Sequence, residues 1–504
     1  MSIYVTLKRF LSVSLLESHT SFPQASEPNA TYKAPVFMRA RALLLIGPSL
    51  FVASAFGACS DTDKAAPSAA GGSAGKAGGH NEAGAEMSAG QGGKAAPAGG
   101  AGALGGESSG GASAGEPGTG GAPYSVCNDG KGAVITGRVT TPSGELPLSN
   151  VSVYVPSTTV DPLPFGTGCW SCAASLIGTP VALGVTGADG KFVIENAPVG
   201  GKVPLVVQTG KWRRQLELEV VDCQENAAPA DSTRLPRDRN EGDLPRIALV
   251  SGAEDTLECL LRKLGIADSE FGTSFSSARV RLFQGKGGIA QLDGVPESTL
   301  DPMAALWTAP APLNGFDLVL LGSESDQNAA AKTTEARAAI HDYVASGGRL
   351  LVQHFQNYFL SAGSADFAGA ATFSPLANLA DPFEVLVDQG SARGKALAAS
   401  LQAADAQATL GKLAIHAGRN SVQAVNAPAV RLLYGSAPAT VQAYSQDVPM
   451  EAGQAACGRL TETELLTASG DTVADFPKGC QSTGLSAQER ALAYLLFDLG
   501  ACIP

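Results

Sequence analysis

The sequence predicts a multidomain chain of 504 residues in which a β-sandwich precedes a doubly wound α/β domain with a β-rich C-terminal elaboration. Three features predict this order. Residues 60–123 contain no aromatic residue, valine or isoleucine, so they cannot form a core. Residues 130–222 carry short Val/Ile-rich runs that alternate with period two. From residue 244 onward, strand-like and helix-like segments alternate.

The N-terminal region predicts export. From Met38 the chain reads MRARALLLIGPSLFVASAFGAC, which has the basic start, apolar stretch and small residues of a secretory signal. We therefore expect residues 1–58 to be a signal region whose true start is Met38. Cys59 follows Gly-Ala, as in a bacterial lipobox, although Phe56 departs from that pattern. This predicts an outer-membrane lipoprotein anchored through Cys59, and cleavage after Ala55 is the alternative.

Residues 59–126 form the next segment, which is rich in Gly, Ala and Ser. Such a composition predicts a flexible tether between the lipid and the folded part. The formal net charge of the whole chain is −12. Because non-specific nucleic-acid binding needs a basic surface, this charge argues against a nucleic-acid partner.

Eight cysteines remain after Cys59, and an even number in an exported chain predicts disulfides. Two of them form the motif Cys169-Trp-Ser-Cys172. The sequence contains no second CxxC motif, and no histidine lies near this one. This motif therefore favours a loop disulfide over a zinc or redox site. We expect Cys457 to pair with Cys480, and Cys169 or Cys172 to pair with Cys127 or Cys223. The full set is Cys127, Cys169, Cys172, Cys223, Cys259, Cys457, Cys480 and Cys502.

Residues 127–225 are predicted to be the β-sandwich. The expected strands are AVITGRV, VSVYV, KFVIEN, VPLVVQ and QLELEVV, and turn-forming Gly, Pro and Asp residues separate them. The stretches GRVTTPSGELPLSNVSVYV and TGADGKFVIENAPVGGKVPLVVQ resemble the carboxypeptidase-regulatory-like family, over about residues 130–222. That resemblance implies a non-catalytic, Ig-like sandwich. Residues 226–243 are expected to be a linker.

Residues 244–504 are predicted to be the α/β domain. Several runs contain continuous stretches of apolar residues, which is typical of parallel strands buried on both faces. These runs are RIALVSG, ARVRLFQG, FDLVLLGSES and RLLVQHF. Ser251 and Glu254 have capping-box spacing and predict a helix that Gly265 ends. The helix TTEARAAIHDYVASGG precedes RLLVQHF. FEVLVD, KLAIHAG, VRLLYG, TVQAYSQ and RLTETELL predict a β-rich elaboration, followed by a final helix that Ser486 and Glu489 cap.

The order of strand, helix, Gly-Gly, strand and turn over residues 245–360 resembles the class I glutamine-amidotransferase-like fold. In that family the turn after the Gly-Gly strand carries a cysteine nucleophile between glycines. Here the turn reads Val-Gln-His-Phe-Gln, with His354 at the nucleophile position and no flanking glycine. Histidine cannot replace the thiolate in acyl transfer. His416, the downstream histidine, has no paired acid two residues later. The sequence therefore does not predict a functional amidotransferase.

Polar residues follow the predicted strands at the edge where α/β sheets bind ligands. The candidates for catalysis are His354, Glu324 and Ser323, and the candidates for ligand binding are Ser251, Glu254, Asp326, Gln353, Gln356 and Asn357. GxSxG, HExxH, P-loop and complete GxGxxG motifs are absent, so we predict no metal and no cofactor.

The chain as a whole resembles a set of myxobacterial-type surface lipoproteins of unknown function, through SNVSVYVPS, VPLVVQTGKWRRQ, RLPRDRNEGDLPRIAL, ECLLRKLGI and LLFDLGAC. Some of these proteins carry the automatic label tryptophan synthase alpha chain, but a sandwich followed by a β-rich tail does not fit that βα barrel. The sequence thus favours a surface protein with a binding, adhesion or structural role and a glycan or protein partner. The alternative is an exported hydrolase or metal-dependent enzyme around Glu324 and His354.

Overall fold

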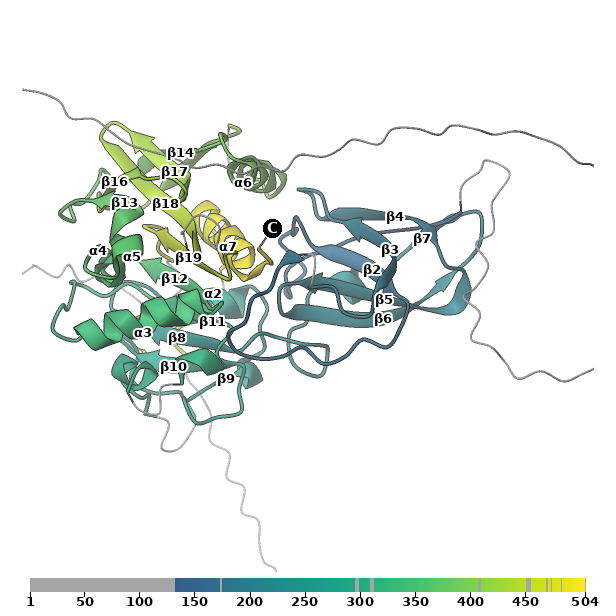
Figure 1. The fold of residues 1–504 in the computed structure, drawn as a ribbon, viewed down its shortest axis with the longest axis horizontal. Helices are drawn as coiled ribbons and strands as arrows, with labels where there is room; N and C mark the ends of the chain where they lie inside the picture. The colour runs from purple at the N-terminus through teal and green to yellow at the C-terminus, as the bar shows by residue number, and fades with distance from the viewer. Residues whose placement is uncertain are drawn as a thin grey trace, which may run out of the picture. The chain divides into compact units, whose positions relative to one another are not determined.

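The structure is a computed structural model. It describes residues 132–503 apart from 173–174, 295–298, 309–311, 407–408, 450–454, 468–469, 473 and 482. The predicted signal region, tether and lipidated Cys59 lie outside these residues, as does Cys127. The described chain is rich in β-structure, with three sheets and several helices in one compact unit (Figure 1).

Seven strands form the first part, which we call the sandwich. One sheet has the order β4-β1-β7 and the other the order β3-β2-β5-β6. Alternate residues of both sheets, such as Ile135, Ile194, Val153 and Leu205, are buried in a common core. The strands are β1 (Ala133–Arg138), β2 (Ser152–Pro156), β3 (Pro180–Val185), β4 (Lys191–Ala197), β5 (Gly200–Thr209), β6 (Trp212–Val220) and β7 (Glu225–Ala227), followed by helix α1 (Ala230–Thr233).

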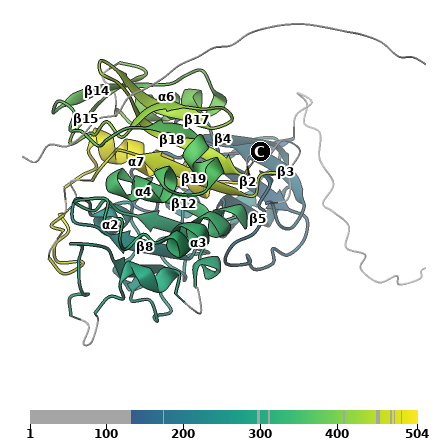
Figure 2. The ribbon, with the colours of Figure 1, turned by 60° about the vertical axis from the view of Figure 1, so that its left-hand side comes forward.

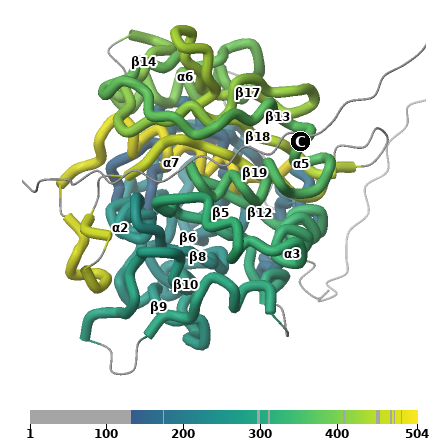
Figure 3. Tube along the Cα trace, turned by 90° about the vertical axis from the view of Figure 1, so that its left-hand side faces the viewer, coloured from purple at the N-terminus to yellow at the C-terminus, as the bar shows by residue number. Residues whose placement is uncertain are grey.

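The second part contains one mixed sheet in the order β15-β14-β17-β18-β19-β12-β11-β8-β10-β9. The six strands from β19 to β9 are parallel, and the others are antiparallel. The order of the strands can be followed in Figure 3, from β14 at the top to β9 at the bottom. Strands β13 and β16 branch from β18. The strands are β8 (Ile247–Ser251), β9 (Phe271–Gly272), β10 (Val280–Gln284), β11 (Leu318–Leu321), β12 (Arg349–Gln353), β13 (Ala371–Phe373), β14 (Phe383–Val387), β15 (Lys412–Ile415), β16 (Val422–Val425), β17 (Val430–Ser436), β18 (Ala439–Val448) and β19 (Gly458–Thr463).

Helices cover both faces of the parallel strands, which explains why those strands are apolar throughout. On one face, residues such as Leu249 and Leu351 share a core with helices α2 and α7. Figure 2 shows the helices and the strands of this part in a second view. On the other face, Val250 and Val352 pack with α3, α4 and α5. The helices are α2 (Leu257–Lys263), α3 (Thr334–Ala345), α4 (Tyr358–Ser361), α5 (Ala365–Gly369), α6 (Ala392–Ala403) and α7 (Ala487–Gly500), with 3₁₀ helices η2 (Asp268–Glu270), η3 (Met303–Leu306), η4 (Leu313–Gly315) and η5 (His354–Asn357).

The helix ends confirm two of the predicted signals and contradict one. Ser486 and Glu489 form the predicted capping box of α7. Gly265 follows the end of α2, as predicted, with a φ of +99°, a conformation that glycine adopts at little cost. The predicted capping box of Ser251 and Glu254 is wrong. Ser251 is the last residue of β8, and α2 begins later, at Leu257, without a side-chain cap.

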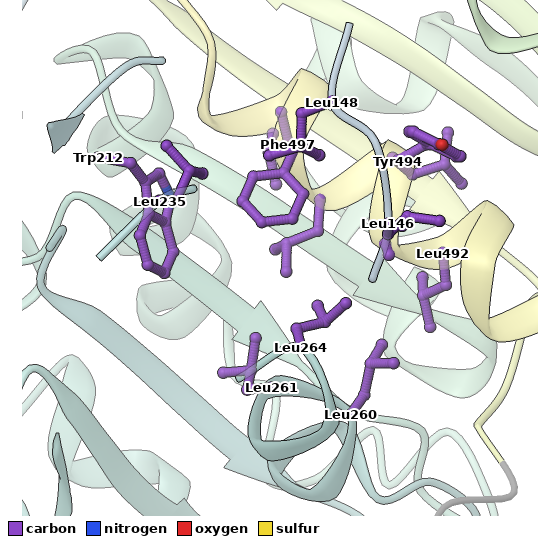
Figure 4. Close-up of a cluster of buried hydrophobic side chains, with 14 of the residues drawn as sticks. Leu146, Leu148, Trp212, Leu235, Leu260, Leu261, Leu264, Leu492, Tyr494 and Phe497 are labelled. Carbon is purple, nitrogen blue, oxygen red and sulfur yellow. The ribbon is translucent and has the colours of Figure 1, made fainter. Parts of the chain in front are cut away.

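The sandwich and the mixed-sheet part share a hydrophobic core (Figure 4). Trp212 of β6 stacks near Phe497 of α7, with ring centroids 5.8 Å apart. The hydroxyl of Tyr494 donates a hydrogen bond of 2.9 Å to the carbonyl of Pro147. Other members of this cluster are Leu146, Leu148, Leu235, Leu260, Leu261, Leu264 and Leu492. The two parts therefore cannot separate without exposing a large apolar surface.

Two disulfides also join these parts. Cys169 pairs with Cys457 and Cys172 pairs with Cys502, so both cysteines of the CxxC motif, in the loop between β2 and β3, are linked to the far end of the chain. A third disulfide, Cys259–Cys480, lies within the mixed-sheet part. Cys223 is also disulfide-bonded.

The observed pairs confirm that these cysteines are oxidised but contradict the predicted partners. Cys457 does not pair with Cys480, and neither Cys169 nor Cys172 pairs with Cys223. The sequence could not give these pairs because they join segments that only the tertiary fold brings together. Stable disulfides indicate an extracellular or otherwise exported protein. Within the described residues, no helix has the length and apolar character needed to cross a membrane.

Candidate functional site

The predicted site lies where the chain order of the parallel strands reverses. The first strand, β8, has β10 on one side and β11 on the other, so the chain passes from β8 to one side of the sheet and then crosses back to the other side. Backbones meet closely here: a Cβ added at Gly252 would collide with the carbonyl oxygen of Ser323. Glycine at position 252 thus lets the loops after β8 and β11 close the space directly above the two strands.

His354 occupies the turn between β12 and helix η5. Its φ is +43°, in the left-handed region that residues with a Cβ seldom adopt. This conformation makes the chain turn sharply from the strand into the helix. Backbone strain of this kind persists only where surrounding contacts hold it, and it occurs often at functional sites.

The imidazole of His354 is fully buried between two glutamates. Its Nε2 donates to the carbonyl oxygen of Glu464 at 2.7 Å and lies 3.4 Å from a carboxylate oxygen of the same residue. Its Nδ1 lies 3.7 Å from Oε2 of Glu254. Burial by itself would lower the pKa of His354, but the two glutamates outweigh burial and raise the pKa above its ordinary value.

Glu254 connects this histidine to the surface. Its carboxylate accepts hydrogen bonds from the Ser323 hydroxyl at 3.1 Å and from Arg419 at 2.8 Å. Partial burial raises the pKa of Glu254, but His354, Arg419 and Ser323 together lower it below its ordinary value. The guanidinium of Arg419 in turn lies 4.5 Å from the ring centre of Phe355. Arg419 and its neighbours thus cover the outer side of the network.

On the inner side, Glu464 accepts a hydrogen bond from Ser421 and approaches a second buried carboxyl, that of Glu462. Neither carboxyl oxygen of Glu462 has a hydrogen-bond partner among the described residues. Burial, and then the charge of Glu464, hold the pKa of Glu462 well above its usual range. Burial and the neighbouring carboxylate of Glu464 thus both favour the neutral form of Glu462.

Two further buried acids lie on the loop after β8 and on α2. Asp255 accepts hydrogen bonds from both the amide and the hydroxyl of Thr467. Burial raises its pKa to about 6 in spite of these bonds. Burial also raises the pKa of Glu258 to about 8, and one of its carboxyl oxygens has no partner in the described chain.

Glu324 does not join the His354 network. It forms a 2.6 Å ion pair with Lys332 and accepts a hydrogen bond from the amide of Lys286. The side chains of both Glu324 and Lys332 are completely buried. A cavity of about 360 Å³ adjoins this pair, and Gln284, Lys286, Met303, Glu324 and Asn328 are among the residues that line it.

The structure brings together three of the predicted residues, His354, Glu254 and Ser323. The other predicted residues lie elsewhere or donate hydrogen bonds to backbone carbonyl groups. Ser251 faces carbonyl groups of the β10 region, Asp326 is exposed and pairs with Lys286, and Asn357 is buried. Gln353 donates to the carbonyl of Leu465, and Gln356 donates to that of Gly322.

Sequence reasoning missed Arg419, Ser421, Glu462 and Glu464. The two glutamates lie in the run Thr461-Glu-Thr-Glu464, whose alternation is typical of a half-exposed strand. In the fold, β19 lies between β12 and β18, and all of its side chains are buried. The pattern offered no signal that could distinguish a buried acid pair from a solvent-facing one.

The network can hold and pass a proton, since an imidazole between two carboxylates exchanges protons readily. However, Nε2 of His354 is already hydrogen-bonded, and no atom of the ring is exposed. The turn presents neither a thiol nor a hydroxyl. In the part of the chain that the structure describes, no three His, Cys, Asp or Glu side chains are grouped to hold a metal ion.

No protein-family model and no curated protein matches this chain. Solved structures with a weak likeness include chains from type II cohesin–X-dockerin complexes of Acetivibrio cellulolyticus, one a C-terminal and one an N-terminal interface mutant. Their sequence identities are 16% and 14%, and the matches cover 29% of this chain and 79% and 88% of those chains. The TM-score is 0.15 in both cases, so this likeness indicates neither a shared fold nor a shared partner.

Proposed function

We propose that this protein is an exported, lipid-anchored surface protein with a binding role, and that its α/β half is an amidotransferase-like domain without amidotransferase activity. The observation that carries the proposal is the burial of His354. At the turn where the family holds its nucleophile, this chain has an imidazole enclosed by Glu254 and Glu464. A substrate carbonyl could not reach it without unfolding the turn.

Two further observations support this proposal. The strand order β10-β8-β11-β12-β19, with helices on both faces, fits an amidotransferase-like sheet. A shared core and two disulfides join the sandwich to the mixed-sheet part. Rigid surfaces bind partners with little loss of conformational entropy, which suits a display protein better than an enzyme that must open and close.

The substitution His354→Asn tests the non-catalytic role. We expect the purified protein to bind envelope polysaccharide isolated from the producing cells saturably, without releasing ammonia from glutamine or cleaving the polysaccharide. Because His354 does not touch the ligand in this proposal, His354→Asn should leave binding unchanged. Turnover of either substrate that disappears in the variant would show that the site is catalytic.

The proposed anchor is the lipid on Cys59. We expect the wild-type protein to fractionate with membranes and the Cys59→Ser variant to be released in soluble form. The reason is that the lipid on Cys59 is the membrane attachment in this proposal, and the variant lacks it. Cell fractionation with an immunoblot measures this. A variant that stays in the membrane fraction would show that the protein is attached by other means.

A further inference from the structure

An aromatic ring with arginines around it lies at the opposite end of the parallel strands from His354. Phe165 belongs to the loop between β2 and β3, and its side chain is exposed by 37%. The guanidinium carbons of Arg246 and Arg279 lie 4.2 and 4.3 Å from its ring centre. Arg246 precedes β8 and Arg279 precedes β10, and Arg281 follows within β10. We call Arg246, Arg279 and Arg281 the arginine cluster.

The loop that carries Phe165 is held rigidly. The amide of Gly166 donates to Asp317 at 2.8 Å, and the ammonium of Lys211 donates to the carbonyl of Gly166 at 2.7 Å. Gly166 has a φ of +83°, and any Cβ there would collide with the carbonyl of Asn314. The ring is thus fixed against the mixed-sheet part before any ligand arrives.

None of the three arginines in the cluster forms an ion pair within the described chain. The nearby carboxylates are already paired with other cations: Glu270 with Arg239, Asp243 with Arg213 and Asp317 with Lys211. The cluster therefore has an excess of positive charge, which Glu270 and Asp243 offset only in part at Arg279. Such an excess is unexpected in a chain whose net charge is −12.

The positive charges disfavour one another. Burial and then the neighbouring Arg239 and Arg246 lower the pKa of Arg279, and burial and then Arg246 lower the pKa of Arg281. The buried Nε atoms of Arg279 and Arg281 also have no hydrogen-bond acceptor in the described structure. If these arginines served only to join two parts of the fold, a carboxylate beside them would make the contact more stable.

We propose that the arginine cluster binds a phosphate or sulfate group. Arg246 and Arg279 lie over the ring of Phe165, and the guanidinium carbon of Arg281 lies 5.7 Å from the ring centre of Phe316. A tetrahedral oxyanion offers three or four acceptor oxygens, which can receive N–H groups from several guanidiniums at once. A single carboxylate has two oxygens and suits one guanidinium fork. Bound there, the anion would neutralise the excess charge and supply the missing acceptors. This inference deepens the proposed binding role by naming a ligand class.

The test compares the wild-type protein with the double variant Arg279→Gln/Arg281→Gln at fixed ionic strength. Inorganic phosphate and sulfate, titrated against a chloride background, should bind the wild type and raise its Tm. Each guanidinium removed should weaken the binding of phosphate and sulfate by a factor of about ten or more, so the double variant should bind both anions much more weakly than the wild type. In chloride alone, the variant should unfold at the same temperature as the wild type or above it, because two repelling charges are gone.

Arg431→Gln is the matched control. Arg431 also stacks on an aromatic ring, at 4.0 Å from the centre of Tyr434, but it is paired with Asp388 at 2.8 Å. Its replacement should leave anion binding unchanged. Equal loss of binding in this variant, or a failure of phosphate, sulfate and dextran sulfate all to bind the wild type, would overturn the proposal.

Dextran sulfate, with uncharged dextran as the blank, distinguishes a group carried on a polymer from a free anion. Tighter binding of dextran sulfate indicates a glycan-borne group, and binding of the inorganic ions alone indicates a free anion; both support the site. The outcome is separable from the proposed function. If the double variant still binds polysaccharide, the proposed binding role is supported without the anion site. If turnover depends on His354, the proposed function is wrong, but the anion site is unaffected.

Discussion

Lys332→Met should lower the free energy of unfolding by about 3–5 kcal/mol, the usual range for removing one partner of a buried ion pair. Lys332 and Glu324 are both completely buried and lie 2.6 Å apart. Methionine keeps most of the volume of the lysine stem but leaves the Glu324 charge without its cation. Lys332 also donates to the carbonyl of Gln327, so that carbonyl loses its donor as well. Urea denaturation at neutral pH measures the difference.

The control for this variant is Lys286→Met. Lys286 pairs with Asp326 at 2.7 Å, but its side chain is 48% exposed, so its loss should cost no more than about 1 kcal/mol. The double variant Lys332→Met/Glu324→Gln should recover much of the lost stability, because the uncompensated charge is gone. If Lys332→Met cost no more than Lys286→Met, the buried pair would not be a significant element of stability.

Glu258→Gln is expected to remove a pH-dependent loss of stability. The pKa of Glu258 rises from 4.5 to about 8 in the folded protein because of burial. Between these values the folded state holds a proton that the unfolded state has released, so the free energy of unfolding falls as the pH rises. A shift of this size corresponds to about 4–5 kcal/mol of stability.

Denaturation at a series of pH values tests this expectation. Wild type and Glu258→Gln should have similar stability near pH 4.5, and the variant should become the more stable one towards pH 8. Asp255, with its pKa raised to about 6, adds a smaller dependence of the same sign in both proteins. Glu219→Gln, on the exposed face of β6, should follow the wild type. Parallel pH profiles for wild type and Glu258→Gln would contradict the assignment.

Period-two alternation predicted the strands of the sandwich, and continuous apolar runs predicted the parallel strands of the mixed sheet. It failed where a distant residue decided the local structure. Glu254 has the spacing of a helix cap relative to Ser251, yet Arg419 and Ser323 take its carboxylate instead. The strand β19 was assigned to a C-terminal elaboration, but it pairs with β12 and extends the parallel sheet. Neither outcome is encoded within a local window of residues.

The same limit applies to the site. The position of His354 at the end of a buried strand follows from the Gly-Gly pair and the apolar run before it, and the structure confirms it. Its partnership with Glu464 depends on β19 lying beside β12, a pairing between residues more than a hundred positions apart. Glu324 was expected near His354 because β11 and β12 are neighbours, but the nearby Lys332 holds it instead.

The disulfides also determine when the protein can mature. Cys169 and Cys172 precede their partners by 288 and 330 residues, and Cys502 is among the last residues of the sequence. Cys169 and Cys172 are therefore synthesised long before the cysteines that they bind in the folded protein. The native pairs can form only after Cys457 and Cys502 have been added to the chain, so the cysteines of the CxxC motif must stay reduced or exchange wrong partners until then.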